Sequence, residues 1–156
     1  MKLEMLAVQK RQFNLENYEE TYESFDWTQV EEQFSWNETG FVNMAYEAID
    51  RHADSEKRNK IALYFSDKDR NEQFTFQDIK NYSNKAGNVL KEEASVEKGD
   101  RVFIFMLRSP ELYFVLLGAI NLGAIVGPLF EAFMEVAVRD RLEDSEAKVL
   151  VTTPEL

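Results

Sequence analysis

The sequence contains no cysteine in its 156 residues and a single histidine, His52. Without cysteine, disulfides, thiolate zinc sites and thiol catalysis are all excluded. One histidine supplies neither a metal site built on several imidazoles nor a pair of histidines for acid–base catalysis. His52 stands near the end of a predicted helix, where a cation beside the helix dipole explains it better than a catalytic role.

Basic residues are also scarce, with 18 lysines and arginines against 29 aspartates and glutamates, a formal net charge of −11. A chain with this charge repels polyanions, so nucleic acid is not an expected partner. Residues 112–130 carry no charge, but glycine and proline interrupt the run. Two consecutive buried elements therefore explain it better than a membrane span.

The common catalytic motifs are missing as well. The chain has no GxxxxGK[ST] loop, no GxGxxG after a strand, no GxSxG and no HExxH. Gly123 and Gly127 open a strand rather than a helix, which indicates close helix–strand packing and not a phosphate cradle. Asp140, Glu143 and Asp144 lie among arginines in the pattern of a solvated helix face. These residues therefore predict no catalytic group and no metal site.

Aromatic residues recur instead among many glutamates in residues 14–58. Tyr18, Tyr22 and Phe25 are spaced to share one helical face. Asp26 is placed to cap a second helix over 28–34, and residues 43–52 predict a third. A stripe of this kind is more often a helix packed on a core than a cage for a ligand.

From residue 60 the pattern alternates between strand and helix, and the fold class is α/β. A polar turn at 67–71 joins two short strands into a hairpin. The βαβαβ arrangement that follows predicts a parallel sheet covered on both faces, with the cover incomplete within this chain. Ser109 is expected to cap the helix after the first parallel strand, with Pro110 in its first turn. The remaining ranges are strands 61–65, 73–76, 101–106, 124–129 and 148–152, and helices 77–94, 110–122 and 134–145.

Several segments together resemble the AMP-forming acetyl-CoA synthetases of the adenylate-forming acyl-CoA synthetase superfamily. They are NLENY (14–18), FSWNETG (34–40), AYEAIDRH (45–52), FTFQDI (74–79) and LGAINLGAI (117–125). The resemblance implies an N-terminal helical, aromatic-rich extension over 1–58 and the first α/β portion of the AMP-binding (adenylation) domain over 59–156. Enzymes of this family are far longer, so we expect an N-terminal fragment, an incomplete piece of the large N-terminal domain.

The family's reaction joins acetate to CoA through an acetyl-adenylate, with ATP and Mg²⁺ as reactants and AMP and pyrophosphate as products. The resemblance thus implies acetate, ATP and CoA as the full-length family's small-molecule partners, and a cytoplasmic location. The phosphate loop and the catalytic lysine match nothing in this chain, so we expect the fragment to be inactive, with no cofactor of its own.

The resemblance also implies a CoA-binding position at Phe130, Glu131 and Ala132, where related enzymes have Phe-Gly-Gly. Phe130 has two possible roles: its ring stacks on adenine, or it packs over the edge of the sheet with no ligand. Glu131 would repel a CoA phosphate unless it turns away or pairs with a base. The alternatives are a non-enzymatic α/β interaction module, with self-association through an exposed sheet edge, and a small CoA- or nucleotide-binding module.

Overall fold

The computed structural model describes Leu15 and residues 17–156, which divide into two compact units. The first unit ends at Gly40 and the second runs from Phe41 to Leu156. The part of the predicted extension in residues 1–14 and 16 lies outside the described residues. The boundary that the resemblance implies at residue 58 concerns domains of the family, and it stays a prediction.

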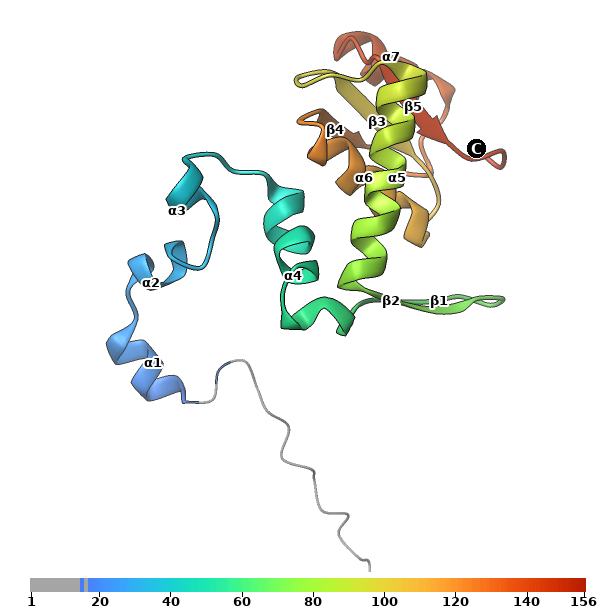
Figure 1. Cartoon of the computed structure of the whole chain (residues 1–156). Coiled ribbons are helices and arrows are strands. Elements are labelled where there is room, and N and C mark those ends of the chain that lie inside the picture. Colours follow the sequence, from blue (N-terminus) through green and yellow to red (C-terminus); the bar gives the residue numbers. More distant parts are fainter. Residues whose placement is uncertain (1–14, 16) are drawn as a thin grey trace, which may run out of the picture. The chain divides into compact units, whose positions relative to one another are not determined.

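The first unit consists of three short helices (Figure 1), namely α1 (Tyr18–Ser24), α2 (Trp27–Glu31) and α3 (Trp36–Thr39). The rings of Tyr18 and Tyr22 stack with centroids 6.0 Å apart. The Asp26 carboxylate accepts a hydrogen bond of 2.7 Å from the Thr28 N–H, so the predicted cap is confirmed. The helix it caps ends at Glu31 and not at residue 34.

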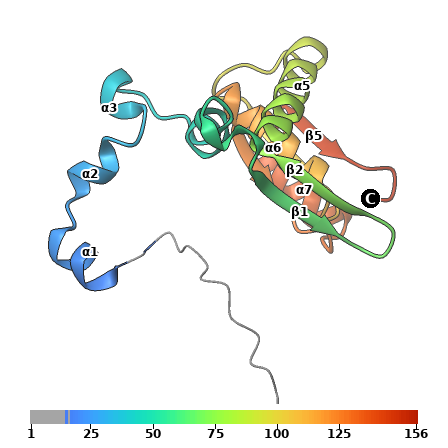
Figure 2. The ribbon, with the colours of Figure 1, turned by 60° about the horizontal axis from the view of Figure 1, so that its bottom comes forward.

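The second unit holds the remaining elements (Figures 1 and 2). In chain order they are the π-helix η1 (Tyr46–Asp50), α4 (Arg51–Ala53), the 3₁₀ helix η2 (Glu56–Asn59), β1 (Ile61–Ser66), β2 (Asn71–Thr75), α5 (Phe76–Ala94), β3 (Arg101–Phe105), α6 (Pro110–Asn121), β4 (Ile125–Pro128), α7 (Glu135–Asp144) and β5 (Val149–Thr152). Strands β1 and β2 pair antiparallel as a hairpin, and β4, β3 and β5 form a parallel sheet in that order. The α/β class, the hairpin and the βαβαβ unit are therefore confirmed.

The two faces of the parallel sheet carry different residues. On one face Val102 is fully buried against Leu90 of α5 and Ala119 of α6, and Val126 and Val149 pack around this core. Side chains alternate along a strand, so Phe105 and Leu150 belong to the other face, where they meet residues of α7. The helices α6 and α7 therefore lie on opposite faces.

Helices α5 and α6 approach each other closely at two glycines. A Cβ atom built on Gly118 would lie 2.5 Å from the Ser83 carbonyl oxygen and 2.7 Å from the Gly87 nitrogen. Ser83 is 1% exposed. The absence of a side chain at Gly118 is what allows the backbones to make this contact. Gly127 likewise allows a close contact within the sheet, since a Cβ atom there would collide with the Phe103 ring.

The helix predicted over 43–52 forms, but η1 interrupts it with π-type hydrogen bonding. Asn43 begins it, since its Oδ1 accepts from the N–H groups of Ala45 and Tyr46. The Asn43 Nδ2 donates to the Ile120 carbonyl at 3.1 Å, which joins this helix to α6. His52 packs its ring on Phe76 with centroids 5.0 Å apart, and burial lowers its pKa.

Two helix starts differ from the expectation. Phe76 is the first residue of α5 and not the last of a strand, because Thr75 and Asp78 form a reciprocal capping box there. Ser109 occupies the N-cap of α6, but its side chain makes no capping hydrogen bond. Pro110 follows at the first helical position, as expected.

The capping box makes the stability of α5 dependent on pH. Hydrogen bonds from the Thr75 hydroxyl and backbone N–H hold the pKa of Asp78 below its usual range. The stability that the carboxylate contributes is complete above the unfolded pKa of about 3.9 and is lost as pH falls toward the lower folded value. We expect Asp78→Asn to cost about 0.5 kcal/mol at neutral pH and progressively less in acid. Urea melts at several pH values would check this, and a pH-independent difference would contradict it.

Candidate functional site

The carboxyl ends of β3 and β4 lie side by side at one end of the parallel sheet. After β3 the chain enters α6 on one face of the sheet, and after β4 it enters α7 on the other. Open α/β sheets bind ligands outside the carboxyl ends of their strands. The loops that follow these two strands are therefore the candidate site.

The loop after β4 presents the predicted residues Phe130, Glu131 and Ala132 in one turn. The Leu129 N–H donates to the Ile104 carbonyl at 2.8 Å and anchors the start of the loop beside β3. A hydrogen bond of 2.9 Å from the Phe133 N–H to the Phe130 carbonyl closes the turn. The two phenylalanine rings meet edge to face at 5.9 Å. Phe130 is nevertheless 54% exposed, so its side chain is accessible from solvent.

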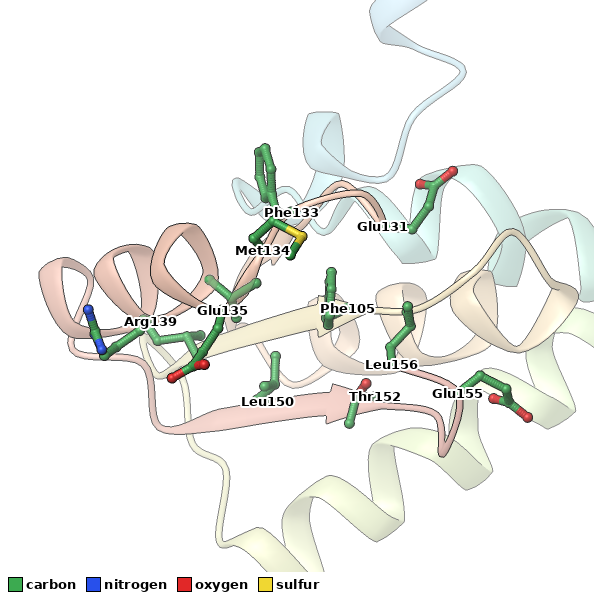
Figure 3. Close-up of a pocket in the computed structure, with 12 residues that line it drawn as sticks. Phe105, Glu131, Phe133, Met134, Glu135, Arg139, Leu150, Thr152, Glu155 and Leu156 are labelled. Carbon is green, nitrogen blue, oxygen red and sulfur yellow. The ribbon is translucent and has the colours of Figure 1, made fainter.

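The Glu131 carboxylate has a basic partner from the loop after β3. Its Oε1 lies 3.9 Å from the Arg108 Nε, an ion pair that is too long for a hydrogen bond. Figure 3 shows the carboxylate pointing away from the strands. The sequence indicated that Glu131 would need to turn away from a CoA phosphate or pair with a base, and Arg108 is a base within ion-pair distance. Nothing in the sequence pattern identified Arg108 as that base.

A cavity of about 530 Å³ lies beside this turn, between α7 and the face of the sheet that carries Phe105 and Leu150 (Figure 3). Its lining is largely apolar with an acidic rim, and Glu131 is the one predicted residue that contributes to it. The lining residues are Phe105, Glu131, Phe133, Met134, Glu135, Val138, Arg139, Leu142, Leu150, Thr152, Glu155 and Leu156. Sequence reasoning missed the cavity, although the spacing of Val138 and Leu142 on one helical face was a signal for it.

The described residues offer little else for chemistry. Among Leu15 and residues 17–156, no three histidine, aspartate or glutamate side chains converge in a way that could hold a metal ion. In the same part of the chain, no helix is long and apolar enough to cross a membrane. Asp140 pairs with Arg139 at 3.8 Å on the exposed side of α7, as expected for a solvated face.

Comparison with known proteins places the chain in a family. The model of the AMP-binding enzyme family matches residues 49–156. Acetyl-coenzyme A synthetase of Bacillus subtilis is 65% identical over all 156 residues, and the chain covers 27% of its length. The enzyme of the same name from Helicobacter acinonychis is 38% identical over 121 residues, which are 76% of this chain and 18% of that protein.

A solved structure agrees with these sequence matches. The crystal structure of a Brucella canis acyl-CoA synthetase superposes with a TM-score of 0.75 at 33% identity, over 88% of this chain and 25% of that one. The chain thus spans 18–27% of the length of these relatives, and it is homologous to the N-terminal region of acetyl-coenzyme A synthetases. Since the family model matches well over half of its residues, the chain belongs to the AMP-binding enzyme family.

Proposed function

We propose that this chain serves as the N-terminal part of an acetate–CoA ligase. The complete enzyme would convert acetate, ATP and CoA to acetyl-CoA, AMP and pyrophosphate by way of an acetyl-adenylate. The observation that carries the proposal is the 65% identity to a Bacillus subtilis acetyl-coenzyme A synthetase over every residue of the chain. The proposal includes the cytoplasm as the location, where ATP and CoA are supplied, and a boundary near residue 58 between the extension and the adenylation domain.

Within this function, Phe130, Glu131 and Ala132 would contact the nucleotide part of CoA. Three observations support that role. The turn lies at the carboxyl end of the strands, where ligands of open α/β folds bind. The exposed ring of Phe130 suits an adenine. The charge of Glu131 is partly matched by Arg108, which lessens its repulsion of a phosphate.

We expect the 156-residue chain by itself to be inactive. Adenylation depends on positioning and electrostatic stabilisation of the phosphoryl groups. The sequence has no segment that matches the family's phosphate loop, which is rich in glycine, serine and threonine, or its catalytic lysine, and the described residues have no acidic cluster for Mg²⁺. Acetate-dependent exchange of pyrophosphate into ATP, measured on the purified chain with magnesium, should therefore stay at the level of buffer. Exchange that follows the protein through purification would contradict this expectation.

The positive test replaces the homologous residues of the Bacillus subtilis relative with this chain. The chimera should catalyse acetate-dependent ATP–pyrophosphate exchange and form acetyl-CoA within about tenfold of the parent rate, because 65% of the exchanged residues are identical. A chimera that is folded by circular dichroism yet forms no acetyl-adenylate would overturn the proposal. The matched control is the relative with its own segment deleted, which should be inactive.

Mass measurement by light scattering separates this proposal from the interaction-module alternative. Strands β4 and β5 are the edges of the described parallel sheet, and each can pair with another chain. An interaction module would show a mass that rises with concentration and no effect of CoA on its melting temperature. A CoA-binding part of an enzyme would be stabilised by CoA instead.

A further inference from the structure

Arg108 differs from most other arginines of the described chain in what its guanidinium contacts. Four of them, Arg51, Arg70, Arg101 and Arg141, donate hydrogen bonds to carbonyl or carboxylate oxygens. Arg108 is 88% exposed, and its single ion pair is the long one to Glu131. Its N–H donors are therefore available to a ligand, and few groups need to be displaced for a ligand to reach them.

The surroundings of Arg108 favour an anion. It lies in the loop between β3 and α6, at the carboxyl end of the sheet and across from the Phe130 turn. The next carboxylate along the chain, Glu111 in the first turn of α6, is bound to Arg70 at 3.0 Å. Glu131 on the opposite loop is thus the one carboxylate that faces the guanidinium in the described structure.

We propose that Arg108 binds a phosphate group of the CoA nucleotide, and that Glu131 is the resident counterion which this phosphate displaces. This inference rests on the proposed function. A guanidinium holds phosphate through paired, charge-assisted hydrogen bonds, which are stronger than a solvent-exposed ion pair at 3.9 Å. With Phe130 beside Glu131, an adenine on the ring and a phosphate on the guanidinium would both lie at the carboxyl end of the sheet.

The two charged residues are expected to act in opposite directions. Arg108→Ala removes the donors and should weaken CoA binding about tenfold. Glu131→Gln removes the competing charge and should tighten it about threefold. Added salt should weaken binding to the parent chain and have less effect on the Arg108→Ala variant.

The experiment is an NMR titration of the 15N-labelled 156-residue chain with CoA, observed at the Phe130 amide and the Arg108 Nε–H. Dephospho-CoA and inorganic phosphate are the comparison ligands, and Arg58→Ala, an exposed arginine of η2, is the matched control variant. We expect CoA to shift both signals, Arg58→Ala to bind like the parent, and Arg108→Ala and Glu131→Gln to change affinity in the stated directions.

Three other outcomes would each contradict a specific part of the two proposals, the CoA site at Phe130 and the role of Arg108. If millimolar CoA shifts neither signal in the folded parent chain, both the CoA site at Phe130 and the role of Arg108 fail. If CoA shifts Phe130 equally well in the Arg108→Ala variant, the site stands and the inference about Arg108 is wrong. If inorganic phosphate alone shifts Arg108 as strongly as CoA does, Arg108 is a general anion contact and the assignment to CoA is wrong.

Discussion

Replacing Gly118 with alanine should destabilise the second unit by about 2–3 kcal/mol. The new methyl group would lie 2.5 Å from the Ser83 carbonyl oxygen and 2.7 Å from the Gly87 nitrogen. Both are backbone atoms, which cannot rotate away, so α5 and α6 must separate along their contact. Overpacking of this kind costs about 1–3 kcal/mol, and more where the backbone has to move. The better helix propensity of alanine, about 1 kcal/mol, offsets part of the cost.

Urea denaturation followed by the helical circular dichroism signal would measure the effect, with the slope compared to confirm an unchanged unfolding transition. Gly87→Ala is the matched control, since it adds the same methyl group to the facing helix. There the nearest atom is 3.2 Å away, so the strain and the propensity gain should nearly cancel. Equal urea midpoints for Gly118→Ala and the parent chain would contradict this prediction, because they would mean that α5 and α6 separate without loss of stability.

Ile104→Ala should cost about 3 kcal/mol, the other large loss of stability that we expect. Ile104 is completely buried in β3, the central strand of the parallel sheet. Truncation to alanine removes the buried methyl groups and leaves a cavity that the surrounding sheet and helices fill only in part, a loss of about 2–5 kcal/mol in other cores. The value belongs in the lower half of that range if the neighbouring apolar side chains relax into the space.

The control for this variant is Ile125→Ala in the neighbouring strand β4. Ile125 is 59% exposed, so the same truncation should cost less than about 1 kcal/mol, mostly from its lower strand propensity. Thermal and urea melts of both variants would give the comparison. A loss at Ile125 as large as that at Ile104 would mean that this edge of the sheet is covered in solution.

Most of the second unit could be predicted from sequence because its signals are local. Pro110 marks the start of α6, and Gly123 follows its end with a φ of +76°, a conformation that glycine adopts most readily. The parallel order of the strands follows from the two helical connections between them. The predicted element boundaries lie within a few residues of the observed ones. One error arises from side-chain capping, since Thr75 caps α5 and the helix therefore begins at Phe76.

Other features depend on contacts that a linear pattern does not contain. The π-type turn at Tyr46–Asp50 has no distinct composition, since the same residues also fit an α-helix. Ser109 stands at the position of a cap, yet its hydroxyl does not close the capping bond. The sequence indicates which residue types favour a conformation, whereas the orientation of one hydroxyl is decided by its neighbours in space.

Only one of the two loops that form the candidate site could be predicted from the sequence. The resemblance implied Phe130, Glu131 and Ala132, and the structure brings them together in a turn at the carboxyl edge. Arg108, which is 23 positions before Glu131 in the sequence, reaches it because β3 and β4 are neighbours. That pairing follows from the strand order, so the partner of Glu131 could be inferred only after the topology was known.

The positions of Trp27 and Trp36 determine what an optical experiment would report. They are the two tryptophans of the chain, and both belong to the first unit, where Trp36 stacks on Phe34 at 4.2 Å. Intrinsic tryptophan fluorescence therefore observes the N-terminal helices alone, whereas far-ultraviolet dichroism is dominated by α5, α6 and α7. Disagreement between the two probes during unfolding would mean that the units unfold independently, and coincidence would mean that they unfold as one cooperative body.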